Sequence, residues 1–240
     1  GEHFMIAKVS GSPGRRLVKV NVQTGVCTLI GDMGDNFSTL AFRPTGELYS
    51  ITGNGSSSLP PETMYVIDTL TGLPTFYRTL GNGADGEVIA FNPDDNFFYH
   101  WSGNGTVIWE KFANDLDPIV PLTTNVVSGE VFGALYSGGG KFWISNISST
   151  IRQWDVPTET AGPVLMSTPD DLRGLVRESC VSSITAGGPT AICSGNNVVL
   201  TVNGGAGSYQ WYQDGAALAG ETNVTYTATV AGLYNCIYLD

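Results

Sequence analysis

The chain has 240 residues, more than one domain usually holds, and its formal net charge of −11 reflects 22 acidic and only 11 basic side chains. The few Lys and Arg residues are scattered and form no basic stripe for a phosphate backbone, which argues against nucleic acid as a partner. No apolar run reaches the roughly 18 residues that a membrane span needs, and short bursts of β-branched and aromatic residues between Gly, Asn, Asp and Pro favour an all-β chain.

The first 180 residues repeat a pattern of two hairpins. One set of segments is an alternating strand that runs into a polar turn: LVKVNVQTG (17–25), MYVIDTLTG (64–72), VIWEKFAND (107–115) and TIRQWDVPT (150–158). A second set is a strand, a turn with Gly or Asp, and another strand: LAFRPTGELYSITG (40–53), IAFNPDDNFFYHWSG (89–103) and GALYSGGGKFWISN (133–146). The equivalent residues Ala41, Ala90 and Ala134 are 49 (90 − 41) and 44 (134 − 90) residues apart. These periods are typical of four-stranded propeller blades.

A fourth blade is divided between the two ends of this region. LRGLVRE (172–178) has the pattern of a first strand and HFMIAKVSG (3–11) that of a second, so we expect the chain ends to close a ring of four blades. The alternative is an open fragment of a larger ring that another subunit completes. The LYxI…TG and LAFxPxGxLY patterns resemble the YVTN/NHL-like propeller domains of secreted bacterial surface proteins. This resemblance implies a β-propeller over residues 1–180 and almost no chemistry.

The last sixty residues have a different pattern. A Ser-, Gly- and Thr-rich stretch at 181–188 predicts a linker, and a second domain at 189–240 contains the alternating segments VVLTV (198–202), YQWYQDG (209–215), TYTATV (225–230) and LYNCIYL (233–239). With Cys193, Trp211 and Cys236 in this order, the segment resembles the immunoglobulin-like (Ig-like) modules of bacterial secreted proteins. The resemblance implies a core Trp211, a tyrosine corner at Tyr234 and a Cys193–Cys236 disulfide.

Export is favoured by the remaining cysteines and by five glycosylation sequons. Cys27 and Cys180 both fall in the blade shared by the chain ends, where a disulfide would reinforce ring closure. The sequons place candidate glycans at Asn36, Asn54, Asn104, Asn146 and Asn223. We therefore expect a secreted protein at the cell surface or outside the cell.

The sequence contains little catalytic chemistry, and we predict that the protein is not an enzyme. GNGADG (81–86) precedes a strand, not the helix of a dinucleotide site, and SGGGK (137–141) is typical of a hairpin turn. Only His3 and His100 are present, and no Gly-x-Ser-x-Gly motif occurs. Four tryptophans in blade strands are expected to pack between blades: Trp101, Trp109, Trp143 and Trp154.

No cofactor is predicted, although two acidic turns have the oxygen ligands that calcium prefers. These are GDMGDN (31–36) and NPDDN (92–96), and neither matches a twelve-residue EF-hand loop. Asp and Asn are also ordinary turn residues, so both interpretations remain open.

The strand at 233–239 has the position of the second-to-last strand of an Ig-like sandwich, with no strand after it. An unpaired apolar edge templates pairing with another strand. Three explanations compete: the linker at 183–192 pairs with it, the natural chain continues, or a neighbouring subunit supplies a strand, with residues 1–11 as the first donor to consider. The predicted assembly edge consists of Leu233, Tyr234, Asn235, Cys236, Ile237, Tyr238 and Leu239.

We therefore expect a non-enzymatic structural or adhesive subunit that self-associates, or binds other surface proteins, in a filament or surface layer. The alternative is a lectin-like propeller that binds glycans or another ligand.

Overall fold

The computed structural model describes residues 3–9, 14–21, 24–53, 55–80, 88–102, 107–123, 130–176, 183–191, 195–203 and 208–239, without the side chains of residues 183, 208 and 237–239. Within these ranges all regular structure is β-strand, as the sequence predicts, and no helix suited to spanning a membrane is found. The chain divides between Arg177 and Glu178 into two compact units, each described by itself.

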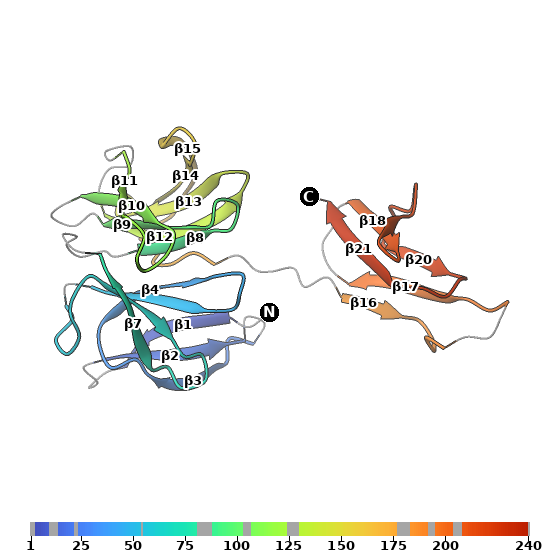
Figure 1. The fold of residues 1–240 in the computed structure, drawn as a ribbon, viewed down its shortest axis with the longest axis horizontal. Helices are drawn as coiled ribbons and strands as arrows, with labels where there is room; N and C mark the ends of the chain where they lie inside the picture. Colours follow the sequence, from blue (N-terminus) through green and yellow to red (C-terminus); the bar gives the residue numbers. More distant parts are fainter. Residues whose placement is uncertain are drawn as a thin grey trace. The chain divides into compact units, whose positions relative to one another are not determined.

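The N-terminal unit contains four antiparallel sheets that follow one another along the chain (Figure 1). The first sheet has the order β1 (His3–Lys8), β2 (Arg15–Val20), β3 (Cys27–Asp32). The second has the order β4 (Phe37–Phe42), β5 (Leu48–Thr52), β6 (Thr63–Ile67), β7 (Pro74–Thr79). The third has the order β8 (Val88–Asn92), β9 (Phe97–Ser102), β10 (Ile108–Phe112), β11 (Val120–Pro121). The fourth has the order β12 (Val131–Gly138), β13 (Lys141–Asn146), β14 (Thr150–Asp155), β15 (Thr160–Ser167).

Local sequence explains why these sheets are built of hairpins. The turn between β12 and β13 uses three successive glycines with positive φ, Gly138, Gly139 and Gly140, at 101°, 61° and 71°. Only glycine adopts such a run without strain. This confirms the prediction that SGGGK forms a hairpin turn. Between β8 and β9 the turn is completed by Asn96 at φ 62°, a backbone state that asparagine tolerates better than most residues.

The core of the N-terminal unit lies between neighbouring sheets. Trp101 and Trp109 of the third sheet pack with Phe142 and Trp154 of the fourth, and similar apolar clusters join the other neighbouring sheets. The prediction for Trp143 is wrong, because this side chain is 43% exposed. Its neighbours on β13, residues 142 and 144, take the buried face, and side chains alternate along a strand.

The expected strand at 172–178 is not formed over its described part, residues 172–176. This segment instead follows β12 without strand geometry: Gly174 N–H donates to the Phe132 carbonyl over 3.0 Å, and Ser145 Oγ donates to the Leu172 carbonyl over 2.8 Å. A Cβ on Gly133 would lie 2.9 Å from the Gly174 nitrogen, so the close approach requires glycine at 133. The segment is therefore held by the fourth sheet, while β1 pairs with β2 in the first.

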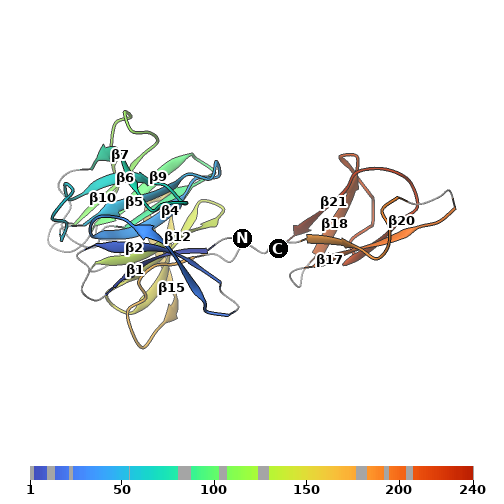
Figure 2. The same ribbon diagram turned by 90° about the horizontal axis from the view of Figure 1, so that it is seen from below.

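The C-terminal unit contains two antiparallel sheets, which can be followed in Figures 1 and 2. One has the order β16 (Ser183–Ala186), β17 (Val198–Asn203), β20 (Thr225–Ala228). The other has the order β19 (Ala216–Ala217), β18 (Ser208–Gln213), β21 (Tyr234–Leu239). The predicted linker at 181–188 is thus wrong in part, because residues 183–186 form β16 and pair with β17.

Candidate assembly edge and cavity

The edge of β21 is the candidate assembly site in the C-terminal unit. β21 pairs with β18 in an unbroken register that runs from Gln213 opposite Tyr234 to Ser208 opposite Leu239. Its six residues, YNCIYL, include neither proline nor a charged side chain. No other described strand pairs with it, so one row of backbone donors and acceptors faces away from the sheet.

Two tyrosines and a tryptophan pack together on the side of β21 that faces the other sheet. Trp211 of β18 is fully buried, and its indole N–H donates to the Asn223 carbonyl over 2.8 Å. The Tyr226 ring lies 5.6 Å from Trp211 and 5.5 Å from Tyr234. Tyr234 Oη donates to the Val230 carbonyl over 2.8 Å, the contact that a tyrosine corner makes.

Burial favours the neutral forms of two titratable side chains of β21, Tyr234 and Cys236. Desolvation raises the pKa of Tyr234 above its ordinary 10.0, so its hydroxyl stays a donor to Val230. Desolvation also raises the pKa of the Cys236 thiol above 9.0, against the opposing effect of a hydrogen bond with the Gln210 backbone. Cys193, the partner predicted for Cys236, lies outside the described residues.

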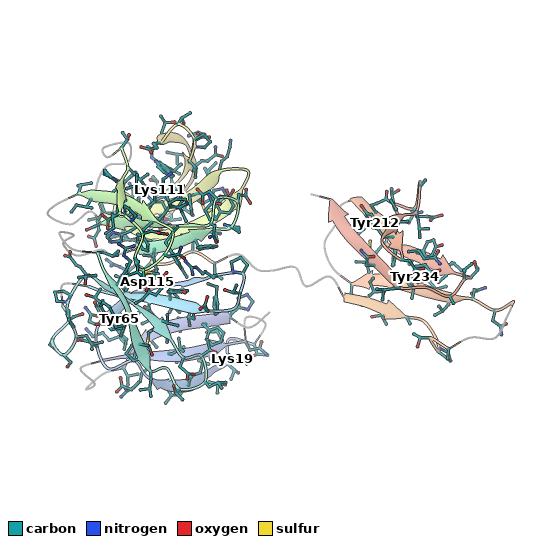
Figure 3. All side chains as sticks on the ribbon, in the orientation of Figure 1. Lys19, Tyr65, Lys111, Asp115, Tyr212 and Tyr234 are labelled. Carbon is teal, nitrogen blue, oxygen red and sulfur yellow. The ribbon has the colours of Figure 1, made fainter. Side chains whose placement is uncertain are left out.

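The core beside β21 is incompletely covered. Tyr234 and Cys236 pack against the cluster around Trp211 but remain half-buried, whereas Trp211 and Tyr209 on β18 are buried. Figure 3 labels Tyr212 and Tyr234, which come from the neighbouring strands β18 and β21. Leu233, just before the strand, is 76% exposed. A further strand beside β21 would cover apolar surface as well as satisfy backbone groups.

Two segments predicted as partners of this edge are used elsewhere. The β16 segment of the former linker pairs with β17 in the opposite sheet, so it does not pair with β21. β1 pairs with β2 over six residues, and its Phe4 and Ile6 pack against the core shared by the first and second sheets. Donation of residues 3–8 to another subunit would break that sheet, so β1 is not a spare strand.

An open cavity of about 590 Å³ lies in the N-terminal unit. It is lined by the end strands β4, β8 and β12 of three sheets, of which β8 lies against the other two, and by Leu175 and Val176. Most of the wall is aliphatic, and the repeat alanines Ala41, Ala90 and Ala134 all belong to it. Three polar side chains join the lining: Arg43, Asp94 and Tyr136.

Arg43 is held over aromatic rings rather than beside a carboxylate. Its guanidinium carbon lies 4.8 Å from the centre of the Phe98 ring and 5.5 Å from that of Phe91, distances typical of cation–π contacts. Its Nη2 donates to the Ala113 carbonyl over 2.5 Å. The buried Nε has no hydrogen-bond partner among the described residues.

Asp94 and Tyr136 form a hydrogen-bonded pair at the same cavity. Tyr136 Oη donates to Asp94 Oδ2 and accepts from the Gly140 N–H over 2.8 Å. Desolvation and the bond to Asp94 raise the pKa of Tyr136 above 10.0, so the phenol keeps its proton and Asp94 serves as acceptor. Sequence reasoning missed Arg43 and Tyr136 as site residues. Both lie two positions after one of the alanines that recur in the repeat, so the period of the repeat could have indicated them.

The two acidic turns use their carboxylates within the protein. Asp35 accepts backbone N–H groups from Asn36, Ser57, Ser58 and Leu59. Burial alone would raise the pKa of Asp35, but these four donors outweigh it and lower the pKa below 3.8. In the other turn, Asp95 accepts from Tyr99 Oη over 2.6 Å. No cluster of three metal-ligating side chains occurs in the described part of the chain.

Of the five sequons, Asn223 is exposed and Asn36 is half-buried with its amide oxygen 2.8 Å from Arg15 Nε. Asn146 is only 2% exposed and accepts from Thr150 Oγ1, so the folded chain does not present this sequon and the prediction there is wrong. Asn54 and Asn104 lie outside the described residues.

The remaining predicted residues are placed as follows. Cys27 has a free, exposed thiol at the start of β3, so the predicted bridge to Cys180 is not formed in this structure, and Cys180 itself lies outside the described residues. His100 is buried with its Nδ1 3.0 Å from Glu110 Oε1 on the neighbouring strand, and His3 begins β1. The GNGADG stretch at 81–86 is outside the described residues.

No protein-family model and no curated protein sequence matches the chain. Among solved structures, the computationally designed Ika4 protein has a TM-score of 0.40 at 16% identity, over 72% of this chain and 91% of that one. A structural genomics protein of unknown function from Bacteroides thetaiotaomicron VPI-5482 has a TM-score of 0.54 at 15% identity, over 72% of this chain and 50% of that one. The chain thus matches about half of the Bacteroides protein, and the likeness concerns the fold alone.

Proposed function

We propose that this chain is a non-enzymatic extracellular subunit, structural or adhesive, that assembles when β21 of one copy accepts an extended strand from another. The single observation that carries this proposal is the unprotected edge of β21, with six residues in regular register, no charge and no proline. Soluble proteins seldom expose such an edge, because it pairs with other strands.

The proposal includes a finer assignment of both units. Four small sheets in sequence, with adjacent end strands around a cavity, support a four-bladed propeller in which residues 172–176 help close the ring. The sheets β16–β17–β20 and β19–β18–β21, with Trp211 buried and Tyr234 bonded to Val230, support an Ig-like sandwich. In that sandwich the open position beside β21 is where the last strand belongs.

Addition of a strand at this position fits assembly better than a closed dimer. When the strand that β21 accepts comes from another part of the partner chain than β21, the contact is heterologous. Heterologous contacts repeat from copy to copy and give an open filament or layer. Backbone hydrogen bonds then supply affinity, and the half-buried Tyr234 and Cys236 supply an apolar surface for the incoming side chains.

Substitution of an exposed residue of β21 tests the proposal. Asn235→Lys adds a charge to the edge without touching the core, since Asn235 is exposed. Thr227→Lys on β20 is the matched control, because it adds the same charge to an exposed position on an edge strand of the other sheet.

We expect the unaltered chain and Thr227→Lys to form large assemblies in sedimentation velocity and negative-stain microscopy, and Asn235→Lys to sediment as a monomer. If the unaltered chain remains a monomer at high concentration, or if both variants assemble equally, β21 is not an intermolecular edge. Circular dichroism confirms that each variant is folded.

A further inference from the structure

We propose that one face of the fourth sheet binds a neutral polysaccharide, with a pyranose ring stacked on the indole of Trp143. This Trp143 face is the side of the sheet opposite the buried Phe142 and Ile144, because side chains alternate along β13. Trp143 is 43% exposed, whereas the other four tryptophans are at most 1% exposed. All residues concerned belong to the N-terminal unit, so this function is independent of assembly at β21.

The four strands of the sheet place a row of residues across the Trp143 face. Leu135 on β12 and Gln153 on β14 lie directly opposite Trp143 in the pairing of β13 with its two neighbours, and opposite residues point to the same face. Gly162 on β15 comes next, because a Cβ there would lie 3.3 Å from the Gln153 Cβ. Since glycine has no side chain, the surface beyond Gln153 stays flat. The row forms a shallow platform with the indole beside an amide.

One end of the Trp143 face is covered by the segment that follows β15. Ser145 lies two residues from Trp143 and therefore points to the same face. Its Oγ donates to the Leu172 carbonyl over 2.8 Å, and a Cβ on Gly133, the residue opposite Ser145, would lie 2.9 Å from the Gly174 nitrogen. The segment thus forms a wall at one end of the platform.

The other end of the Trp143 face carries two side chains of opposite charge. Lys141 and Asp155 lie opposite each other, two residues from Trp143 and Gln153. Asp155 Oδ1 accepts from the Thr158 hydroxyl over 2.7 Å and from the Thr158 N–H over 3.0 Å. These hydrogen bonds, and to a lesser degree the charge of Lys141, lower the pKa of Asp155 below 3.8, so the carboxylate is ionised near the ammonium. The two charges offset each other, which favours a neutral ligand over an anion or a cation.

These groups match the chemistry of a pyranose with equatorial hydroxyls. The two faces of such a ring present axial C–H groups, which form an apolar surface that packs on a flat indole. The hydroxyls around the ring both donate and accept hydrogen bonds, as does the Gln153 amide. Neither that amide nor the Trp143 indole N–H has a hydrogen bond with another of the described residues. Both groups are therefore available to the rim of a stacked sugar.

The exposed area suits one sugar ring better than a second copy of the chain. A whole aromatic side chain buries about 150–250 Å², and Trp143 is only partly exposed. A stable interface buries roughly 800 Å² on each partner, so the indole supplies a small fraction of that area. The wall at one end and the charged pair at the other leave the platform open to a narrow, neutral chain.

Acrylamide quenching of tryptophan fluorescence reports on this site, because Trp143 is the one exposed tryptophan of the five. The probe is cellotetraose, a neutral chain of β-linked glucose, and the control is sorbitol, which has similar hydroxyls but no ring. The full chain carries Asn235→Lys, so that assembly does not affect the signal. We expect cellotetraose to protect the indole with a Kd of about 1 mM and sorbitol to bind at least about tenfold more weakly. No protection at about 10 mM cellotetraose, or equal protection by sorbitol, would overturn the proposal.

Variants locate the site by isothermal titration with cellotetraose. Trp143→Ala should weaken binding at least about tenfold, whereas Trp143→Phe keeps an aromatic ring and should weaken it only about threefold. Gln153→Ala should weaken binding about fivefold, the usual net effect of one hydrogen bond. Phe76→Ala is the matched control, because it removes a 62% exposed ring from β7 of the second sheet, and it should leave binding unchanged.

Two results would contradict the assignment of this face to a sugar. One is equal weakening of cellotetraose binding by Phe76→Ala and Trp143→Ala. The other is protection of Trp143 from acrylamide that rises with protein concentration instead of with cellotetraose, which would assign the face to a contact between copies.

Discussion

The outer strands of the N-terminal unit have features that hinder pairing with a further strand, whereas the outer strand β21 of the C-terminal unit does not. β7 begins with Pro74, β11 has two residues and includes Pro121, and β15 contains Pro163 and two irregularities in its pairing with β14. Proline offers no backbone N–H, and a bulge bends an edge away from a partner. β21 has none of these features.

This difference between the outer strands indicates at which sheet edges pairing with another chain is hindered. A chain that exposed four regular outer strands in its N-terminal unit would risk pairing at each of them. Proline, bulges and short length protect three of these edges, and the fourth, β3, has an irregular pairing with β2 and an ion pair between Arg16 and Asp32. Only the edge of β21 among these outer strands combines length, regularity and lack of charge. This difference supports the proposal that the edge of β21 accepts a strand from another copy.

The largest expected effect comes from removing a core tryptophan, first from one unit and then from the other. Trp211→Ala should destabilise the C-terminal unit by about 3–5 kcal/mol and abolish assembly, because the indole fills the core behind β21. Trp154→Ala should destabilise the N-terminal unit by a similar amount. Differential scanning calorimetry should show two transitions, one lost or lowered in each variant. If either substitution lowered both transitions equally, the units would not fold independently.

Part of this architecture follows from sequence alone, because hairpins are local. The 49- and 44-residue periods depend on alternating residues and turn glycines that act within a few positions, and the corresponding strands form as predicted. The edge position of β21 also followed from counting strands in the last sixty residues. Trp143 was misjudged although Phe142 and Ile144 beside it indicate the buried face, so strict alternation would have corrected it.

Other features depend on contacts between distant segments and leave no local signal. Residues 172–176 have a strand-like pattern, yet their conformation depends on the close approach of Gly133 and Gly174, which are 41 residues apart (174 − 133). The short segment of β16 has the composition of a linker, and only its pairing with β17 makes it a strand. Arg43 donates to the Ala113 carbonyl across 70 residues of sequence, and this contact could not be predicted from the residues beside Arg43.

A smaller effect is expected when the protection of an N-terminal edge is removed. Pro163→Val restores a backbone N–H and a β-branched side chain to β15, whose Val164, Leu165 and Met166 are already exposed. In the Asn235→Lys background, we expect this variant to self-associate at roughly tenfold lower concentration than its parent, about 1.4 kcal/mol. Sedimentation equilibrium measures the difference. An unchanged association would mean that the bulges of β15, rather than its proline, protect that edge.

The smallest expected effect concerns the hydrogen bond that positions β21. Tyr234→Phe keeps the ring that packs 5.5 Å from Tyr226 and removes only the hydroxyl that donates to Val230. The loss should lower the free energy of unfolding of the C-terminal unit by about 1 kcal/mol, the usual net value of one hydrogen bond. Tyr212→Phe on β18 is the control at a neighbouring position, since the Tyr212 hydroxyl has no hydrogen bond with another of the described residues, and it should change stability by less than about 0.5 kcal/mol. Urea unfolding followed by tryptophan fluorescence measures both. An incoming strand can pair with β21 only if the backbone of β21 is already held in the right position. If Tyr234→Phe weakened assembly far more than it weakened folding, the hydroxyl would therefore act by positioning the backbone of the accepting edge.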